Sequence, residues 1–365
     1  MAAGSTGRAD QGGSMRSITR ARTRLVLGSA VLALASALTA CSPDASTREP
    51  AGRGGAQPAP VAETTAAGDA LAIMVPSERG TGWDATGQAL VDVLTAEGVE
   101  NGVDIVHYRG ADGTVGLTQL VGQADPDSLL VVGDVLVGAV ELTDAAATLE
   151  DVTPLARLTD EPLAVVVTAD SPYTTVSDLL DDVVANGPAV AIAGGPAGSA
   201  DHVLAARMLL AAGVPAADVA SRLRYVPQSG AGESFDPLFD GSVRAAVADV
   251  SEHADLLASG SLRALAVSGA ERSPALPDVP TLTEQGVDVV VTGWRGVAAA
   301  GTLEQARVDE LVALLTTAHG SAAWTAALDE HGWSDAFLTG PELDAFVAGE
   351  VAAVRQTLLD VGLAS

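Results

Sequence analysis

Short apolar runs alternate with helix-length segments along most of the chain, and this alternation is the strongest constraint on its fold. The apolar runs predict strands at 71–76, 103–108, 128–133, 163–168, 189–193, 222–226, 243–248, 262–268 and 288–292. The segments between them predict helices at 84–97, 114–123, 174–186, 199–212, 233–239, 251–258, 303–318, 321–331 and 341–361. Strand–helix alternation is typical of α/β layers with largely parallel sheets.

The N-terminal region has the pattern of a secretion signal. Arginines at 16, 20, 22 and 24 precede an apolar run from 25 to 40, which is short for a membrane span. The run ends in Leu38-Thr-Ala-Cys41, which resembles a bacterial lipobox. We therefore expect residues 1–40 to be a lipoprotein signal peptide, with its start at Met1 or Met15 and lipid attachment at Cys41.

Cys41 is the only cysteine in the chain. A lone cysteine excludes an internal disulfide and disfavours a cysteine-ligated metal site. An incidental thiol in a cleaved signal is the alternative to acylation. We expect neither a metal nor a cofactor in this protein.

Residues 41–69 are rich in small residues and proline and lack apolar periodicity. Such a segment cannot bury enough surface to offset its ordering entropy. We expect a disordered tether with a reach of about 30 Å, which would hold a lipid-anchored domain away from the membrane.

The charge of the chain excludes one class of partner. All 19 basic residues are arginine, and five of them precede Cys41, as does one of the 47 acidic residues, so the remainder carries a net charge of −32. Nucleic-acid binding needs basic patches, so we expect no nucleic-acid partner. The absence of lysine also excludes a phosphate-loop lysine and a Schiff base.

Two glycine-rich turns connect a predicted strand to a predicted helix. The first runs from Pro76 through Gly80 and Gly82 to Asp84, and the second runs from 194 to Ser199. Glycine admits a ligand close to the backbone, and the first turn of a helix offers free amides with a partial positive charge. These turns are therefore candidate anion sites, with ordinary tight turns as the alternative. The first turn departs from the dinucleotide fingerprint in its spacing.

A third stretch, 262–286, joins a predicted strand to a proline-rich connector that is either a hinge or a plain linker. Its residues Arg263-Ala-Leu-Ala-Val, Arg272-Ser-Pro-Ala-Leu-Pro-Asp-Val-Pro-Thr and Glu284-x-Gly carry a specific resemblance. The segment 294–302, Trp-Arg-Gly-Val-Ala-Ala-Ala-Gly-Thr, adds to it. From about residue 70 to its end, the chain resembles the Bug-type substrate-binding proteins of tripartite tricarboxylate transporters.

The resemblance implies a fold and its division. Members are α/β proteins with a two-lobed fold like that of the type II periplasmic binding proteins and a ligand cleft between the lobes. It implies a first lobe at 70–167, a second lobe at 168–290 and a return to the first lobe at 291–365.

The resemblance also implies a set of ligand contacts to a small organic carboxylate. These are Ser77, Gly80, Gly82, Asp84, Gly195, Gly198, Ser199, His202, Tyr225, Gln228 and Asp249. The first loop departs from the family pattern, because Ser77-Glu-Arg-Gly-Thr-Gly stands where a proline pair and consecutive glycines are usual. We add Arg79 to the candidate contacts, since its guanidinium could hold a carboxylate in a bidentate pair or instead pair with Glu78.

Other candidate residues receive weaker interpretations. His107, His253, His319 and His331 lack metal-ligand spacing and are expected to be structural. Trp83 and Trp294 are expected either to line the cleft or to pack in the core, whereas Trp324 and Trp333 are expected in the core. No Gly-x-Ser-x-Gly elbow is present, which disfavours a serine hydrolase.

Three functions follow from these features. The first is an extracytoplasmic lipoprotein, anchored to the cell membrane, that delivers a carboxylate to the membrane permease subunits of a transporter and is not an enzyme. The second is a receptor that uses the same clamp to signal to a membrane kinase. The third is a secreted α/β enzyme.

Overall fold

The computed structural model describes residues 70–99, 102–143, 145–228, 235–251 and 253–364. All of these belong to one compact unit, Gln57–Ser365. The expected signal peptide, Cys41 and the tether lie outside the described residues. Within the described ranges no single helix is long and apolar enough to cross a membrane. Together, the helices Gln305–His319 and Ala322–His331, which are bent by 68° at the break between them, have the length and composition of a span, but only by those two measures.

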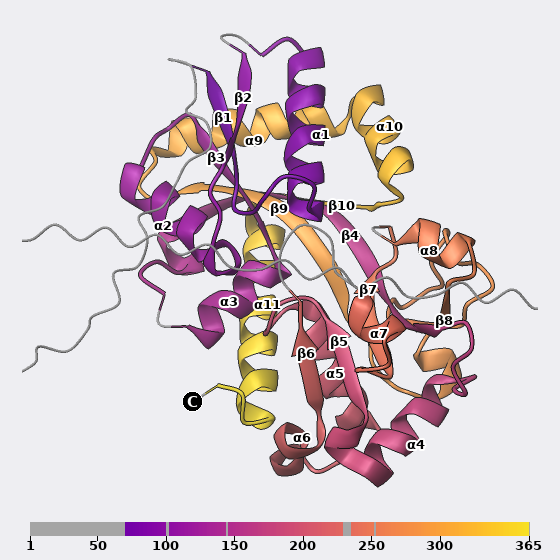
Figure 1. Ribbon diagram of the computed structural model, residues 1–365. Helices are drawn as coiled ribbons and strands as arrows, with labels where there is room; N and C mark the ends of the chain where they lie inside the picture. Colours follow the sequence, from indigo (N-terminus) through magenta and orange to yellow (C-terminus); the bar gives the residue numbers. More distant parts are fainter. Residues whose placement is uncertain (1–69, 100–101, 144, 229–234, 252, 365) are drawn as a thin grey trace, which may run out of the picture. The chain divides into compact units, whose positions relative to one another are not determined.

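The described residues form ten strands and eleven α-helices (Figure 1). The strands are β1 (Leu71–Val75), β2 (Val103–His107), β3 (Ser128–Gly133), β4 (Val152–Thr168), β5 (Ala191–Gly194), β6 (Arg224–Pro227), β7 (Ala245–Asp249), β8 (Leu262–Val267), β9 (Thr292–Ala300) and β10 (Ser334–Leu338). The helices are α1 (Gly82–Ala96), α2 (Thr114–Gln123), α3 (Asp134–Leu142), α4 (Val176–Asn186), α5 (Ala200–Ala211), α6 (Ala216–Arg222), α7 (Asp236–Phe239), α8 (Ala254–Ala258), α9 (Gln305–His319), α10 (Ala322–His331) and α11 (Gly340–Asp360).

The strands follow the order β2-β1-β3-β9-β4-β7-β5-β6, with β8 and β10 also paired to β4. The outer strands pair in parallel, as expected for strand–helix alternation. The central strands β4, β9, β7 and β8 pair antiparallel, so the expectation of largely parallel sheets holds only toward the two edges. Antiparallel strands in the centre make the sheet a mixed one.

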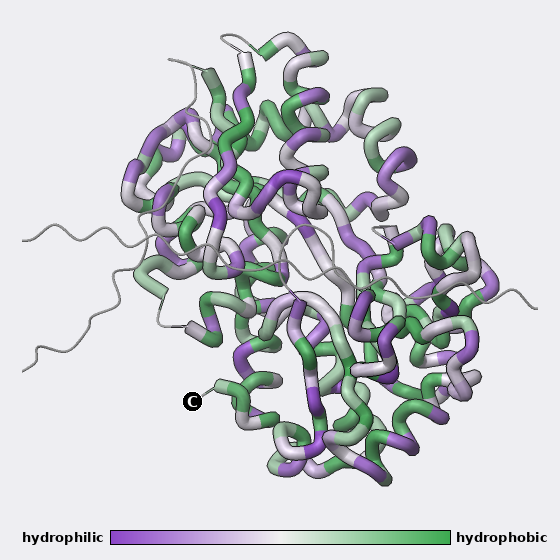
Figure 2. The backbone as a smooth tube through the Cα atoms, viewed as in Figure 1, coloured by the Kyte–Doolittle hydropathy of each residue, from purple (hydrophilic) through white to green (hydrophobic). Residues whose placement is uncertain are grey.

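The long strand β4 links two parts of this sheet. Its residues 152–162 pair with β9, and residues 163–168 pair with β7 and β8. One apolar core forms around β1, β3 and β9, and two more form on opposite faces of the β5–β7 region. Helices such as α1 and α11 alternate hydrophobic and hydrophilic residues, as amphipathic cover requires (Figure 2).

Several predicted elements differ from the structure. Residues 288–291 are irregular and the strand begins at Thr292, so the strand predicted at 288–292 is wrong. The true strand is rich in glycine and alanine because neighbouring backbones approach closely: a Cβ on Gly296 would lie 2.5 Å from the Ala156 carbonyl oxygen. The predicted elements also leave out α3, α6, β10 and the first half of β4.

The proline-rich connector packs against β8 rather than standing free. Thr281 forms a parallel bridge with Val267, and the Val267 amide donates to Pro280 O at 3.0 Å. Arg272 Nε donates to a Glu284 carboxylate oxygen at 2.8 Å across the base of the connector. These contacts make the connector an ordered cover for this end of the sheet.

A backbone contact holds α3 against the loop that precedes α5. An ideal Cβ on Gly138 would lie 2.1 Å from the Gly198 carbonyl oxygen, and Gly198 itself has a φ of +89°. Only glycine at both positions permits this approach. The contact joins α3, which follows β3, to the loop after β5.

We expect Gly138→Ala to destabilise the protein by about 1–3 kcal/mol, because the new methyl group must displace the Gly198 backbone. Gly349→Ala is the matched control, since nothing lies within 4 Å of its Cβ position in α11. There the same exchange should stabilise the helix by about 0.5–1 kcal/mol. Urea denaturation midpoints measure both changes. Equal shifts in the two variants would contradict the contact.

Candidate functional site

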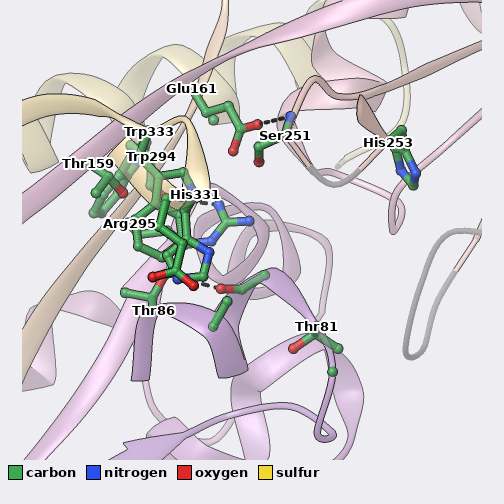
Figure 3. A pocket seen from close by; sticks show the side chains of 15 residues that line it. Thr81, Thr86, Thr159, Glu161, Ser251, His253, Trp294, Arg295, His331 and Trp333 are labelled. Atoms are coloured by element: carbon green, nitrogen blue, oxygen red, sulfur yellow. Dashed lines mark hydrogen bonds between the residues drawn. The ribbon is translucent and has the colours of Figure 1, made fainter. Parts of the chain in front are cut away.

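A cavity of about 300 Å³ opens where five segments of the chain meet (Figure 3). These segments are the start of α1, the middle of β4, the loop after β7, the start of β9 and the end of α10. The lining residues are Gly80, Thr81, Gly82, Ala85, Thr86, Thr159, Glu161, Ser251, His253, Gly293, Trp294, Arg295, Glu330, His331 and Trp333. The cavity thus combines backbone amides, charged groups and aromatic rings.

The pairing of β4 with β9 decides which side chains face the cavity. Thr159 lies opposite Arg295, and Glu161 lies opposite Gly293. Directly paired residues share a face of the sheet, and their sequence neighbours point to the other face. The Trp294 ring therefore lies on the far face, where it meets the Phe346 ring at a centroid distance of 5.2 Å.

Arg295 is held between two carboxylates. Its Nη1 donates to Asp134 Oδ1 at 3.1 Å, and its Nη2 lies 3.5 Å from Asp249 Oδ2. Gly293 leaves room for this cluster, because a Cβ there would lie 3.3 Å from Asp249 Oδ1. The Arg295 side chain is only 13% exposed, so its charge needs these partners.

Asp134 also caps the helix α5. Its Oδ2 accepts the Ala200 amide at 3.0 Å, and its Oδ1 accepts the Trp294 amide at 3.4 Å. This carboxylate is 6% exposed. The first amide of α5 is therefore satisfied by a side chain of the protein itself.

The first glycine turn shapes the start of α1. Thr81 caps the helix by accepting the Asp84 amide, and the Asp84 carboxylate accepts the Gly80 amide at 2.7 Å and faces His107 Nε2 at 2.6 Å. Among the described residues, the amides of Gly82 and Trp83 have no acceptor. Gly82 lines the cavity, so this helix presents unpaired donors at its edge.

The second glycine turn forms a separate cluster. Ser199 Oγ donates to Asp201, the Gly198 amide donates to His202 Nδ1 at 3.2 Å, and Tyr225 Oη donates to the Gly195 carbonyl oxygen at 2.8 Å. The His202 and Tyr225 rings stack with centroids 4.0 Å apart. These groups bond to one another and do not line the cavity.

The predicted ligand contacts therefore do not form one site, because they lie at the cavity, in the first glycine turn and in the second cluster. Gly80 and Gly82 line the cavity, and Asp249 contacts its arginine. Ser77, Arg79 and Asp84 belong to the first turn without lining the cavity, and Gly195, Gly198, Ser199, His202, Tyr225 and Gln228 lie in or beside the second cluster.

Most residues of the cavity wall are not among the predicted ligand contacts. Glu161 lies in the unpredicted half of β4, and His253 and His331 were expected to be structural. Trp333 was expected in the core, but it packs only partly buried against the core edge, lines the cavity and stacks on His331 with ring centroids 4.2 Å apart. Trp324 is buried in the core as expected. The signal that could have revealed this wall is the group of charged residues at 157–161, which interrupts an otherwise apolar region.

Residues 95–363 match the model of the "Tripartite tricarboxylate transporter family receptor". The chain belongs to this receptor family. Its members are extracytoplasmic solute-binding proteins, so the chain is a solute-binding receptor and not an enzyme.

Individual relatives agree with this assignment. The chain is 26% identical over 309 residues to protein BugT of Bordetella pertussis, covering 82% of this chain and 92% of that one. A TctC solute-binding protein from Polaromonas is 25% identical, with a TM-score of 0.62 over 79% of this chain and 97% of that one. The structure of R. palustris Rpa4515 with adipate has a TM-score of 0.69 at 22% identity over 81% and 98% of the two chains. The receptor has the mixed α/β fold of the periplasmic binding proteins.

The His202 cluster predicts a pH dependence of stability. Burial lowers the pKa of His202 from 6.5 to about 4. Between these values the unfolded chain binds a proton that the folded chain does not, so stability is highest above pH 6.5 and falls toward pH 4, by about 3 kcal/mol. His202→Gln should flatten this part of the stability curve in urea titrations at successive pH values. An unchanged slope, or an NMR-titrated pKa near 6.5, would contradict the assignment.

Proposed function

We propose that the receptor captures a small organic carboxylate in the cavity at the start of α1 and delivers it to the membrane subunits of a tripartite tricarboxylate-type transporter. The observation that carries this proposal is the pair of amides at Gly82 and Trp83, which have no acceptor in the part of the chain that the structure describes. A carboxylate there would accept hydrogen bonds from the backbone and gain from the helix dipole. Adipate, the ligand of the R. palustris neighbour, is a carboxylate and supports this ligand class.

A hinge between two lobes would let the cavity close over its ligand. We assign lobe boundaries at 70–167, 168–290 and 291–365, which fall close to the end of β4 at Thr168 and the start of β9 at Thr292. Closure would remove water and strengthen each hydrogen bond to the ligand.

A lipid on Cys41 would keep this receptor beside its permease. The basic segment, apolar run and Leu38-Thr-Ala-Cys41 motif support this assignment.

Thermal-shift and calorimetric screens of mono-, di- and tricarboxylates test the ligand class. A carboxylate that raises the melting temperature in proportion to its affinity is the expected result. If no carboxylate in the panel binds, the proposed function is wrong.

Gly82→Pro tests the backbone donor directly. Proline is well tolerated at the first position of a helix, and Thr81 already has the extended ψ of 166° that proline requires of its predecessor. The variant should fold normally yet bind its carboxylate at least about tenfold more weakly, because a hydrogen bond to a charged group is lost. Gly82→Ala, which adds a Cβ but keeps the N–H, is the matched control for calorimetry. Equal affinities of the two variants would exclude the amide as a ligand contact.

The anchor has an independent test. Cells expressing the full chain should incorporate labelled palmitate into the protein, whereas Cys41→Ser should remove the label and release the receptor from the membrane fraction. Equal labelling of the two proteins would contradict lipid attachment at Cys41.

A further inference from the structure

The described wall of the cavity carries more negative than positive charge. Arg295 is its only arginine, and the chain has no lysine. Glu161 and Glu330 are its carboxylates, while His253 and His331 add charge only when protonated. Because Asp134 and Asp249 already contact Arg295, that guanidinium contributes little net positive charge to a ligand.

The wall offers one position for an anion. Unbonded amides lie at the start of α1, on the Gly82 side of the cavity. The start of α5 does not belong to this wall, and Asp134 accepts its first amide, that of Ala200, at 3.0 Å. A second carboxylate on the ligand would therefore find neither a free helix start nor an uncompensated cation among these residues.

Glu161 lies on the opposite side of the cavity from the start of α1. In Figure 3 its carboxylate and Thr81 lie on opposite sides of the lining residues. The β4–β9 register turns Glu161 to the cavity, and the Ser251 amide holds one oxygen at 2.6 Å. This hydrogen bond fixes the carboxylate in place.

A carboxylate has about four acceptor sites, so a fixed Glu161 can accept further hydrogen bonds from a ligand. A ligand ammonium there would be attracted, and a ligand carboxylate would be repelled in a site of reduced dielectric.

We infer that the ligand of this receptor carries a single carboxylate, bound at the start of α1, and an ammonium group at its other end, bound by Glu161. This inference rests on the proposed function and narrows its ligand class to amino acids with separated charges. Glu161 is then the residue that selects against dicarboxylates.

Isothermal calorimetry with three ligands of equal chain length tests this inference on the wild-type receptor. The probes are 4-aminobutyrate, glutarate and pentanoate, which carry an ammonium, a carboxylate or a methyl group at the far end of the same three-methylene chain. The same comparison with β-alanine and succinate, and with 5-aminopentanoate and adipate, covers shorter and longer ligands. For the chain length that binds most tightly, the amino acid should bind at least tenfold more tightly than the diacid of the same length.

If that diacid binds as tightly as the amino acid, or more tightly, the inference is overturned and the proposed function is left intact. If none of these carboxylates binds, the proposed function fails and the inference fails with it.

Glu161→Gln locates the selectivity in one side chain, because it keeps the size of the residue and removes its charge. It should weaken binding of the amino acid at least tenfold and strengthen binding of the diacid. Asp160→Asn is the matched control, since Asp160 is the next residue on β4 and pairs opposite Trp294 on the other face. It should leave the ratio of the two affinities unchanged. An unchanged ratio in folded Glu161→Gln would remove Glu161 as the selecting residue, and the ligand ranking of the wild type stands as a test even if that variant does not fold.

Discussion

The buried carboxylate of Asp134 is the interaction on which the arrangement around the cavity depends. One side chain accepts the first amide of α5, accepts a backbone amide of β9 and pairs with Arg295. These partners come from distant parts of the chain and meet at one residue that is 6% exposed. Removing the carboxylate would take one of two acidic partners from the buried Arg295 guanidinium and the acceptor from the first amide of α5, which is costly in a low-dielectric interior.

A receptor for anions need not be basic. This chain carries a formal charge of −28 and has no lysine, yet the start of α1 presents unpaired donors to the cavity. Backbone dipoles act over a few ångströms, whereas the charge of the exposed acidic residues is screened by salt. The local field at Gly82 and the total charge of the protein are therefore separate properties.

Periodicity and glycine placement were sufficient to predict the α/β class and most elements, because apolar runs and turns are local signals. They failed for β9, where Gly296 and a run of alanines form a strand through close backbone contact with β4. They also failed for the cavity wall, because Glu161 and Arg295 become neighbours only through strand register. For the second glycine turn, no local signal shows that Asp134, 66 residues earlier, occupies the start of its helix.

The contact between Gly138 and Gly198 has a mechanical consequence. Two backbones touch there without side chains between them, so no rotamer can absorb a change in their separation. If the segments around the cavity rotate when a solute enters, we expect the backbones of Gly138 and Gly198 to move least. Displacements should then grow with distance from this contact, and the end of α10 at the far rim would travel farther than the residues of α3.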